Sequence, residues 1–214
     1  IQLVQIISRV YYLVQLNILI KTSITPMKII FLDHDGVICL STEWGGRYKK
    51  QQKAGRKMSQ SVLSLELDAR FDNFNKKAIT ILNSIIEETG AEIVVSSDWK
   101  RWATCEEMGE YYEAKGIIKK PIAYTPDLGD CIIHGTNFIW SPQWDLEQTR
   151  AIEIKQYLHD HPEVTNWVAI DDLNMGKGED WREVWALDNF VLTPKKMEGI
   201  KQSGIKEKVL EFLK

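Results

Sequence analysis

Residues 27–40 read MKIIFLDHDGVICL and combine an apolar run with a short polar segment. The apolar residues 29–32 have the pattern of a buried strand, and the chain then changes abruptly to the polar run DHDG. Gly36 allows a sharp turn directly after this strand. Asp33 and Asp35 place two carboxylates two residues apart, and such a pair can hold a divalent cation or share nucleophilic and proton-transfer roles. It can equally belong to an ordinary solvated turn.

Four further runs have the pattern of buried strands, because each is short, rich in Ile, Val or aromatic residues, and apolar on both faces. Helix-period patterns separate them, including one over 75–89, one over 146–159 and one that follows Ser203. Alternation of this kind predicts a three-layer α/β domain with a mainly parallel five-stranded sheet. The predicted strands are 28–33, 92–96, 121–125, 167–171 and 189–193.

The bulk composition is that of an ordinary globular protein. The chain has 214 residues, 44% of them hydrophobic, and a formal net charge of −3, so no whole-molecule field attracts it to nucleic acid or acidic membranes. The three cysteines are widely spaced and form no CxxC motif. This pattern argues against a disulfide framework or a zinc site and favours reduced thiols in a cytoplasmic protein.

The first 26 residues differ from the rest, because they are mostly apolar with only two charges. Residues 1–20 approach the length of a membrane-spanning helix, but the segment contains several polar residues and lacks the features of a signal peptide. Met27 directly precedes the first strand. We therefore interpret residues 1–26 as an extension outside the folded domain, which comprises residues 27–214, and we expect no membrane partner.

Two stretches interrupt the alternation of strands and helices, and both are interpreted as small cap-type insertions. They cover residues 38–72 and 126–145 and follow predicted strands, so they lie over the edge of the sheet where ligands bind. The first contains residues 44–65, which are rich in lysine and arginine and carry no acid. This basic run is either an anion-binding cap over the first strand or a solvated, mobile insert. Its candidate substrate contacts are Arg47, Lys49 and Lys50.

Polar residues also follow two other predicted strands. The second strand ends in Ser96 and Ser97, whose hydroxyls suit a phosphate oxygen, and the fourth ends in the carboxylate pair Asp171 and Asp172. Serine pairs and aspartate pairs also cap helices and turns. Because parallel strands end at one edge of the sheet, however, we expect these side chains to lie near Asp33.

Trp99 and Lys100 follow the second strand closely and are further candidates for substrate contact. An exposed Trp99 ring would offer a face on which a base could stack. Packing in the core explains a tryptophan equally simply, and it is the interpretation that we favour.

These motifs resemble those of the haloacid dehalogenase (HAD) superfamily of phosphohydrolases. FLDHDGVI, IVVSS and VAIDD match its first, second and fourth motifs in this order. The third motif is a basic residue in the helix before the fourth strand, for which Arg150 is the better match and Lys155 the weaker one. Together with SSDWK, TRAIEIKQYL and NFVLTPKKMEGI, the pattern is similar to the HAD domain associated with RNA-repair (Swiss Army Knife) proteins.

The resemblance implies a Rossmann-like HAD fold with the strand order 5-4-1-2-3. It also implies that Asp33 is the nucleophile, forming an aspartyl-phosphate, and that Asp35 protonates the leaving oxygen and later activates water. Mg²⁺ would be held by Asp33, the backbone carbonyl of Asp35, Asp171 and Asp172. Ser96 and Arg150 would bind the phosphoryl group. His34 replaces the usual apolar residue of the first motif, and we expect it to pack outward without a catalytic role.

The function that follows is Mg²⁺-dependent hydrolysis of a phosphomonoester, on a nucleotide or on the terminal phosphate of a nucleic acid. Two alternatives stay open: a phosphatase of small metabolites, and a non-catalytic module that binds nucleic acid or a protein partner. A metal-dependent nuclease fits the order of the motifs less well.

Overall fold

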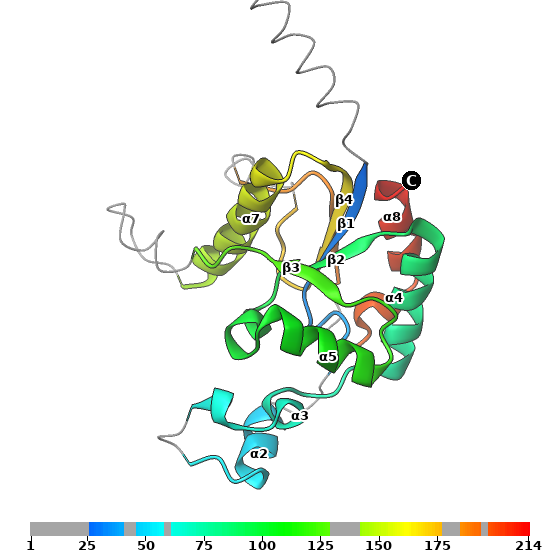
Figure 1. Cartoon of the computed structure of the whole chain (residues 1–214). Helices are drawn as coiled ribbons and strands as arrows, with labels where there is room; N and C mark the ends of the chain where they lie inside the picture. The colour runs from blue at the N-terminus through cyan, green and yellow to red at the C-terminus, as the bar shows by residue number, and fades with distance from the viewer. Residues whose placement is uncertain (1–25, 41–45, 58–60, 129–141, 177–184, 194–196) are drawn as a thin grey trace, which may run out of the picture.

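The computed structural model describes residues 26–40, 46–57, 61–128, 142–176, 185–193 and 197–214. These residues form one sheet of five parallel strands between two layers of helices (Figure 1). The strands are β1 (Met27–Leu32), β2 (Glu92–Val95), β3 (Pro121–Tyr124), β4 (Val164–Asp171) and β5 (Phe190–Leu192). Their order, β3-β2-β1-β4-β5, confirms the predicted order and places β1 at the centre.

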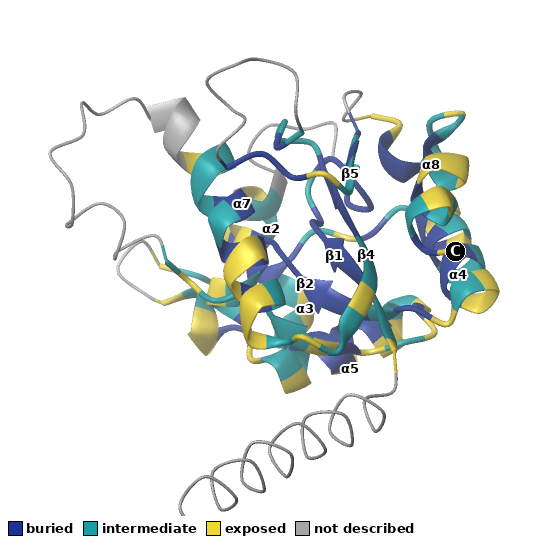
Figure 2. Ribbon diagram, turned by 90° about the horizontal axis from the view of Figure 1, so that it is seen from above, coloured by how far each residue is buried: buried dark blue, intermediate teal, exposed yellow. Residues whose placement is uncertain are grey.

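Both faces of β1 are buried, as its continuous apolar run predicts (Figure 2). Ile29 and Phe31 belong to the apolar cluster on the side of α7, and Ile30 and Leu32 to the larger cluster on the opposite side. The helices are α7 (Pro142–Asp160) on the first side and α4 (Lys76–Thr89), α5 (Cys105–Lys115) and α8 (Ile205–Phe212) on the second. This arrangement is the predicted three-layer architecture.

The three helices predicted from the sequence are present, and they differ in how they begin. The side chain of Asn75 accepts hydrogen bonds from two backbone N–H groups in the first turn of α4, which ends at Gly90 in the left-handed conformation. The helix after Ser203 is α8, but Gly204 occupies its N-cap position and no side chain caps it. The predicted helix 146–159 is the longer α7, which begins at Pro142.

The apolar pattern of the sequence does not predict α5 (Cys105–Lys115). This helix begins with a capping box, in which the Thr104 side chain accepts from the Glu107 N–H and the Glu107 side chain accepts from the Thr104 N–H. Only a narrow stripe is buried, including Met108, Tyr111 and Tyr112, among acidic residues that face solvent. The capping box was the signal in the sequence that identifies this helix.

The first insertion is folded onto the body of the domain in the part that the structure describes. It contains α2 (Gly46–Lys53), a 3₁₀ turn η1 (Val62–Ser64) and α3 (Leu67–Arg70), which lie together beside α5 (Figure 1). The buried Arg70 side chain donates to the Trp102 carbonyl (3.2 Å) and to Glu107 Oε1 (3.0 Å). These bonds attach the insertion to the segment after β2.

Most of the second insertion, residues 129–141, lies outside the described part of the chain, and its last residues form the start of α7. Residues 1–25 also lie outside it. Among the helices that are described, none combines the length and the apolar character needed to cross a bilayer.

Candidate active site

Three neighbouring strands bring their carboxyl ends together at one edge of the sheet. The Asp33 N–H, directly after β1, donates to the Ile170 carbonyl of β4 (3.1 Å). The Ser96 N–H, directly after β2, donates to the Leu32 carbonyl (3.0 Å). Asp33 and Ser96 therefore continue the hydrogen bonding of the sheet, and both residues lie at the same edge of it.

An acidic cluster, formed by Asp33, Asp171 and Asp172, lies at this edge. Each residue offers one carboxylate oxygen, and these oxygens lie within 4.8 Å of one another. The Asp33 and Asp171 residues are only 3% and 1% exposed. Such an arrangement of oxygen donors suits a hard divalent cation such as Mg²⁺, which prefers a few carboxylates and completes its shell with water or phosphate.

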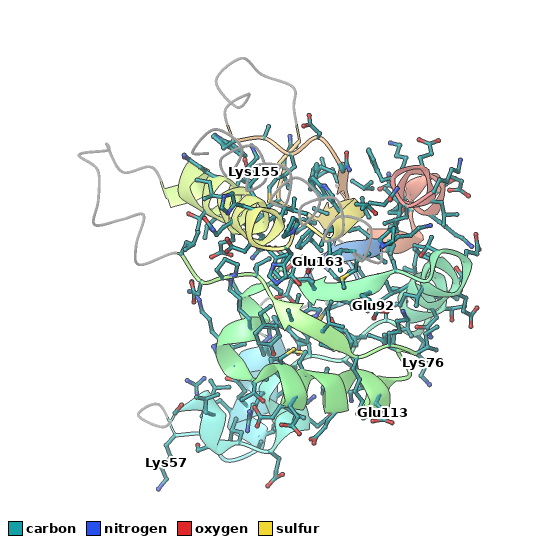
Figure 3. The ribbon with its side chains drawn as sticks, turned by 45° about the horizontal axis from the view of Figure 1, so that its top comes forward. Lys57, Lys76, Glu92, Glu113, Lys155 and Glu163 are labelled. Carbon is teal, nitrogen blue, oxygen red and sulfur yellow. The ribbon has the colours of Figure 1, made fainter. Side chains whose placement is uncertain are left out.

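Arg150 from α7 supplies the positive charge that faces this cluster. Its Nη1 lies 2.9 Å from Asp171 Oδ2 and 3.2 Å from Asp33 Oδ1, and its Nη2 lies 3.7 Å from the more exposed Asp98. Lys155, the weaker match to the third motif, is exposed on the same helix (Figure 3). The structure thus brings Arg150, and not Lys155, to the carboxylates.

One guanidinium does not offset the crowding of these acids. Burial, reinforced by the charge of Asp171, raises the pKa of Asp33 well above its usual range, although Arg150 and Ser97 act in the opposite direction. Burial likewise raises the pKa of Asp171. The protein alone thus disfavours the ionised forms of these carboxylates, and a divalent cation would favour them. The converging carboxylate oxygens, within 4.8 Å of one another, are the observation that makes the site fit a metal.

Gly36 forms the sharp turn that brings the DHDG segment against Asp172. Its φ of +75° lies in the left-handed region that favours glycine. A Cβ atom at this position would lie 2.5 Å from Asp172 Oδ2, far inside van der Waals contact. The buried Thr193 side chain, at the end of β5, donates to the Gly36 carbonyl (3.2 Å) and fixes the turn.

We predict that Gly36→Ala displaces Asp172 and weakens Mg²⁺ binding by about tenfold or more, because the clash falls on a carboxylate of the acidic cluster. Gly55→Ala is the matched control, since Gly55 also has a positive φ (+88°) but open space where a Cβ would lie. Calorimetric titration with Mg²⁺ measures the difference. Equal affinities in the two variants would show that Asp172 does not ligate the ion.

The two serines after β2 have different surroundings. Ser96 Oγ is buried and finds no hydrogen-bond partner among the residues that the structure describes. Ser97 bonds to the Asp33 carboxylate and caps the 3₁₀ turn η2 (Asp98–Trp102), accepting from the Trp99 N–H at 3.5 Å. Since buried hydroxyls are nearly always hydrogen-bonded, the unsatisfied Ser96 has a donor available for a ligand oxygen.

Asp35 lies outside the acidic cluster and is held by other groups. Arg47 Nη2 donates to both of its carboxylate oxygens, at 2.6 and 2.7 Å, and Trp99 Nε1 donates to Oδ2 at 2.9 Å. The Asp35 side chain is about half exposed, at 49%. Its carboxylate therefore lies at the opening of the site, facing the first insertion.

Trp99 and Lys100, which the sequence offers as candidate substrate contacts, are both bound to other residues of the protein. Trp99 is fully buried, and its ring stacks on those of Phe71 and Phe74, so no base can stack on it here. Lys100 Nζ is buried against Glu153 Oε2 (2.7 Å) and the Pro126 carbonyl (2.9 Å). Both side chains are engaged by other parts of the protein, as packing predicts for Trp99, and neither is available to a substrate.

The basic residues of α2 are divided between the body and the surface. Lys50 Nζ donates to the Phe71 carbonyl (2.7 Å) and pairs with Asp68 (3.2 Å), whereas Lys49 is exposed. Asp72 and Trp102 flank Arg47. Asp72 lies in no strand-end motif, so no local signal in the sequence points to it. Trp102 follows the second predicted strand, as Trp99 does, and the sequence makes it a candidate for base stacking.

His34 packs inside the protein, and the expectation of outward packing is wrong. The residue is fully buried, and its Nε2 lies 2.6 Å from the Tyr112 hydroxyl of α5. Burial lowers its pKa to about 3, so the imidazole is neutral at physiological pH. The side chain belongs to the face of β1 opposite Asp33, because side chains alternate along a strand.

A parallel sheet whose central strand ends in DxDG, beside a serine and a second aspartate pair, defines the class of HAD-like proteins. The model of one family, described as the HAD domain in Swiss Army Knife RNA repair proteins, matches residues 29–204. The chain belongs to this family. A search of curated proteins and a search of solved structures each gave no match.

Proposed function

We propose that the protein is a Mg²⁺-dependent phosphomonoester hydrolase that works through an aspartyl-phosphate on Asp33. The observation that carries the proposal is the position of Asp33, a buried carboxylate at the end of the central strand. It lies in the acidic cluster and 3.2 Å from the Arg150 guanidinium. Membership in a HAD family from RNA-repair proteins supports the same chemistry.

The residues present fit a magnesium ion. The side chains of Asp33, Asp171 and Asp172 would hold it together with the backbone carbonyl of Asp35. When bound, the ion neutralises phosphoryl oxygens and keeps the crowded carboxylates ionised.

The protein's own residues divide the two chemical steps between them. In the first, an Asp33 oxygen forms a bond to phosphorus while the bond from phosphorus to the leaving oxygen breaks, and Asp35 gives that oxygen a proton. In the second, Asp35 takes a proton from a water molecule as it attacks phosphorus, which releases inorganic phosphate and regenerates Asp33. Arg150 and the Ser96 hydroxyl bind the equatorial oxygens throughout, with Ser97 orienting Asp33.

We propose a nucleotide or a nucleic-acid terminal phosphate as the substrate, and hence a role in end repair. The family's occurrence in RNA-repair proteins and the basic first insertion beside Asp35 support this choice. Lys49 remains a candidate contact, being exposed on α2. The unpaired thiols of Cys39 and Cys105 suit a reducing, cytoplasmic setting.

A phosphatase screen with and without Mg²⁺ tests the proposal. It covers nucleotides, oligonucleotides phosphorylated at the 3′ or 5′ end, sugar phosphates and p-nitrophenyl phosphate. Mg²⁺-dependent release of phosphate, fastest from the nucleotides or oligonucleotides, is expected. Preference for a sugar phosphate would favour the small-metabolite alternative, and no turnover of any ester would favour the non-catalytic module.

We also predict a characteristic pH dependence of stability for the metal-free protein. Because the folded-state pKa values of Asp33 and Asp171 lie above the unfolded value of 3.8, the folded state binds these protons more tightly. Their contribution to the unfolding free energy is therefore most favourable at low pH and decreases as the pH rises from about 4 through the raised pKa values.

Mg²⁺ should reverse this loss at neutral pH, stabilising the fold by about 2.7 kcal/mol at 100 times its dissociation constant. The stabilisation should shrink towards pH 4, where protons compete for the same carboxylates. Urea unfolding at several pH values measures both effects, with NaCl at matched ionic strength as the control. A stabilisation by Mg²⁺ that does not change with pH would contradict the assignment of these carboxylates as ligands.

A further inference from the structure

Arg47 is held in a fixed orientation at the opening of the site. Its Cζ lies 4.9 Å from the centre of the Trp99 ring and 5.0 Å from that of Trp102, so two aromatic rings contact the planar guanidinium. Trp99 is in turn fully buried and stacks on Phe71 and Phe74. The Arg47 side chain is only 20% exposed. Much of the entropy cost of ordering an arginine is therefore already met before any ligand binds.

The bonds of Arg47 leave part of its donor capacity unused. An arginine pairs best with an oxyanion through two nitrogens that donate in parallel. Here Nη2 alone donates to both oxygens of Asp35. The Nε atom is buried and has no hydrogen-bond partner among the described residues, because the Asp72 oxygen beside it is 3.8 Å away. Nε is enclosed by the protein, but a phosphate at the exposed part of this side chain would supply a further oxygen acceptor to the guanidinium.

We infer that Arg47 binds a second phosphate group of the substrate, carried by the leaving alcohol. This inference rests on the proposed function. Asp35 is the residue that gives a proton to the leaving oxygen, so the leaving alcohol must lie beside it. Arg47 of α2 contacts Asp35, which is not a member of the acidic cluster. An anion bound to Arg47 therefore belongs to the leaving group, because Ser96 and Arg150 serve the scissile phosphate.

The other basic groups of α2 fit this role less well. Lys50 already donates to the Phe71 carbonyl and pairs with Asp68. A lysine is also a point charge without the planar arrangement of donors that matches phosphate. Arg47 thus selects substrates with two phosphates, such as the phosphorylated end of a polynucleotide or a nucleoside bisphosphate, over simple monoesters.

The test compares Arg47→Ala with the parent protein on three substrates: a phosphorylated oligonucleotide, a nucleoside 3′,5′-bisphosphate and p-nitrophenyl phosphate. The variant should lose about 10- to 100-fold more kcat/KM on a substrate with two phosphates than on p-nitrophenyl phosphate, as for a lost hydrogen bond to a charged group. Arg47→Lys should recover only part of this loss. Lys53→Ala removes the same charge from an exposed position of α2 and should leave the ratio between substrates nearly unchanged.

A selective loss on the oligonucleotide alone identifies a polynucleotide end, and a loss on both doubly phosphorylated substrates identifies the second phosphate itself. Equal losses on all three substrates, or none, overturn the inference while leaving the phosphatase proposal intact. Absence of turnover by the parent protein on every ester defeats the proposed function and the inference together. Binding of the oligonucleotide to Asp33→Asn, with and without Arg47→Ala, and circular dichroism of each variant separate lost recognition from lost folding.

Discussion

Asp33→Asn should abolish phosphate release, reducing kcat by a factor on the order of 10⁴ or more, because an amide oxygen cannot attack phosphorus. The variant should nevertheless fold at least as stably as the parent protein in the absence of metal. It removes one of two buried, mutually repelling carboxylates at the edge of the sheet. Steady-state phosphate release and urea unfolding measure the two effects.

Asp160→Asn is the matched control, since it makes the same chemical change at the exposed end of α7, before β4 begins. It should retain full activity. Turnover by Asp33→Asn above a few per cent of the parent rate would remove the covalent mechanism. Loss of activity accompanied by unfolding would leave the role of Asp33 to be decided by Asp33→Glu, which keeps the charge but moves the carboxylate.

Arg150→Ala should have the largest effect on stability. Arg150 lies within 3.2 Å of both Asp33 and Asp171, and all three residues are buried. Removing one partner from a buried ionic network leaves charges without compensation, which costs about 3–5 kcal/mol. The loss should be measured by urea unfolding at pH 7.5 without Mg²⁺, and it should be smaller with Mg²⁺ present.

Lys155→Ala serves as the control for this variant, because it removes the same charge from an exposed position on the same helix. Its unfolding free energy should be nearly unchanged. A loss of less than about 1 kcal/mol for Arg150→Ala, below the range for buried pairs, would show that the two carboxylates do not depend on the guanidinium. It would reopen the question of the third-motif residue.

The fold class could be predicted from the sequence because short apolar strand patterns alternate with helix patterns along the chain. β1 is apolar at every position that packs against the helices on its two faces, and a short continuous run of this kind is typical of a strand covered on both sides. The strand order followed from a resemblance in motifs, since nothing in a strand's own residues states which strand lies beside it. The α5 helix was missed because its apolar stripe is narrow and its helix signal lies in the Thr104 capping box.

The acidic cluster was predictable because each member ends a strand, and parallel strands share one carboxyl edge. The residues that surround Arg47, in contrast, could not be predicted from the sequence. Its partners Asp72 and Trp102 come from separate segments that only tertiary packing brings together. The burial of His34 was not predictable for a related reason, since its partner Tyr112 belongs to α5, which the apolar pattern does not indicate.

Trapping the phosphorylated residue would show directly which side chain attacks phosphorus. During turnover with Mg²⁺, rapid acid quenching followed by borohydride reduction converts an aspartyl-phosphate to homoserine, and peptide mass spectrometry locates it. Homoserine at position 33 alone, formed only with substrate and absent from Asp33→Asn, is the predicted result. Reduction at another aspartate, or none during active turnover, would contradict a mechanism in which Asp33 attacks phosphorus.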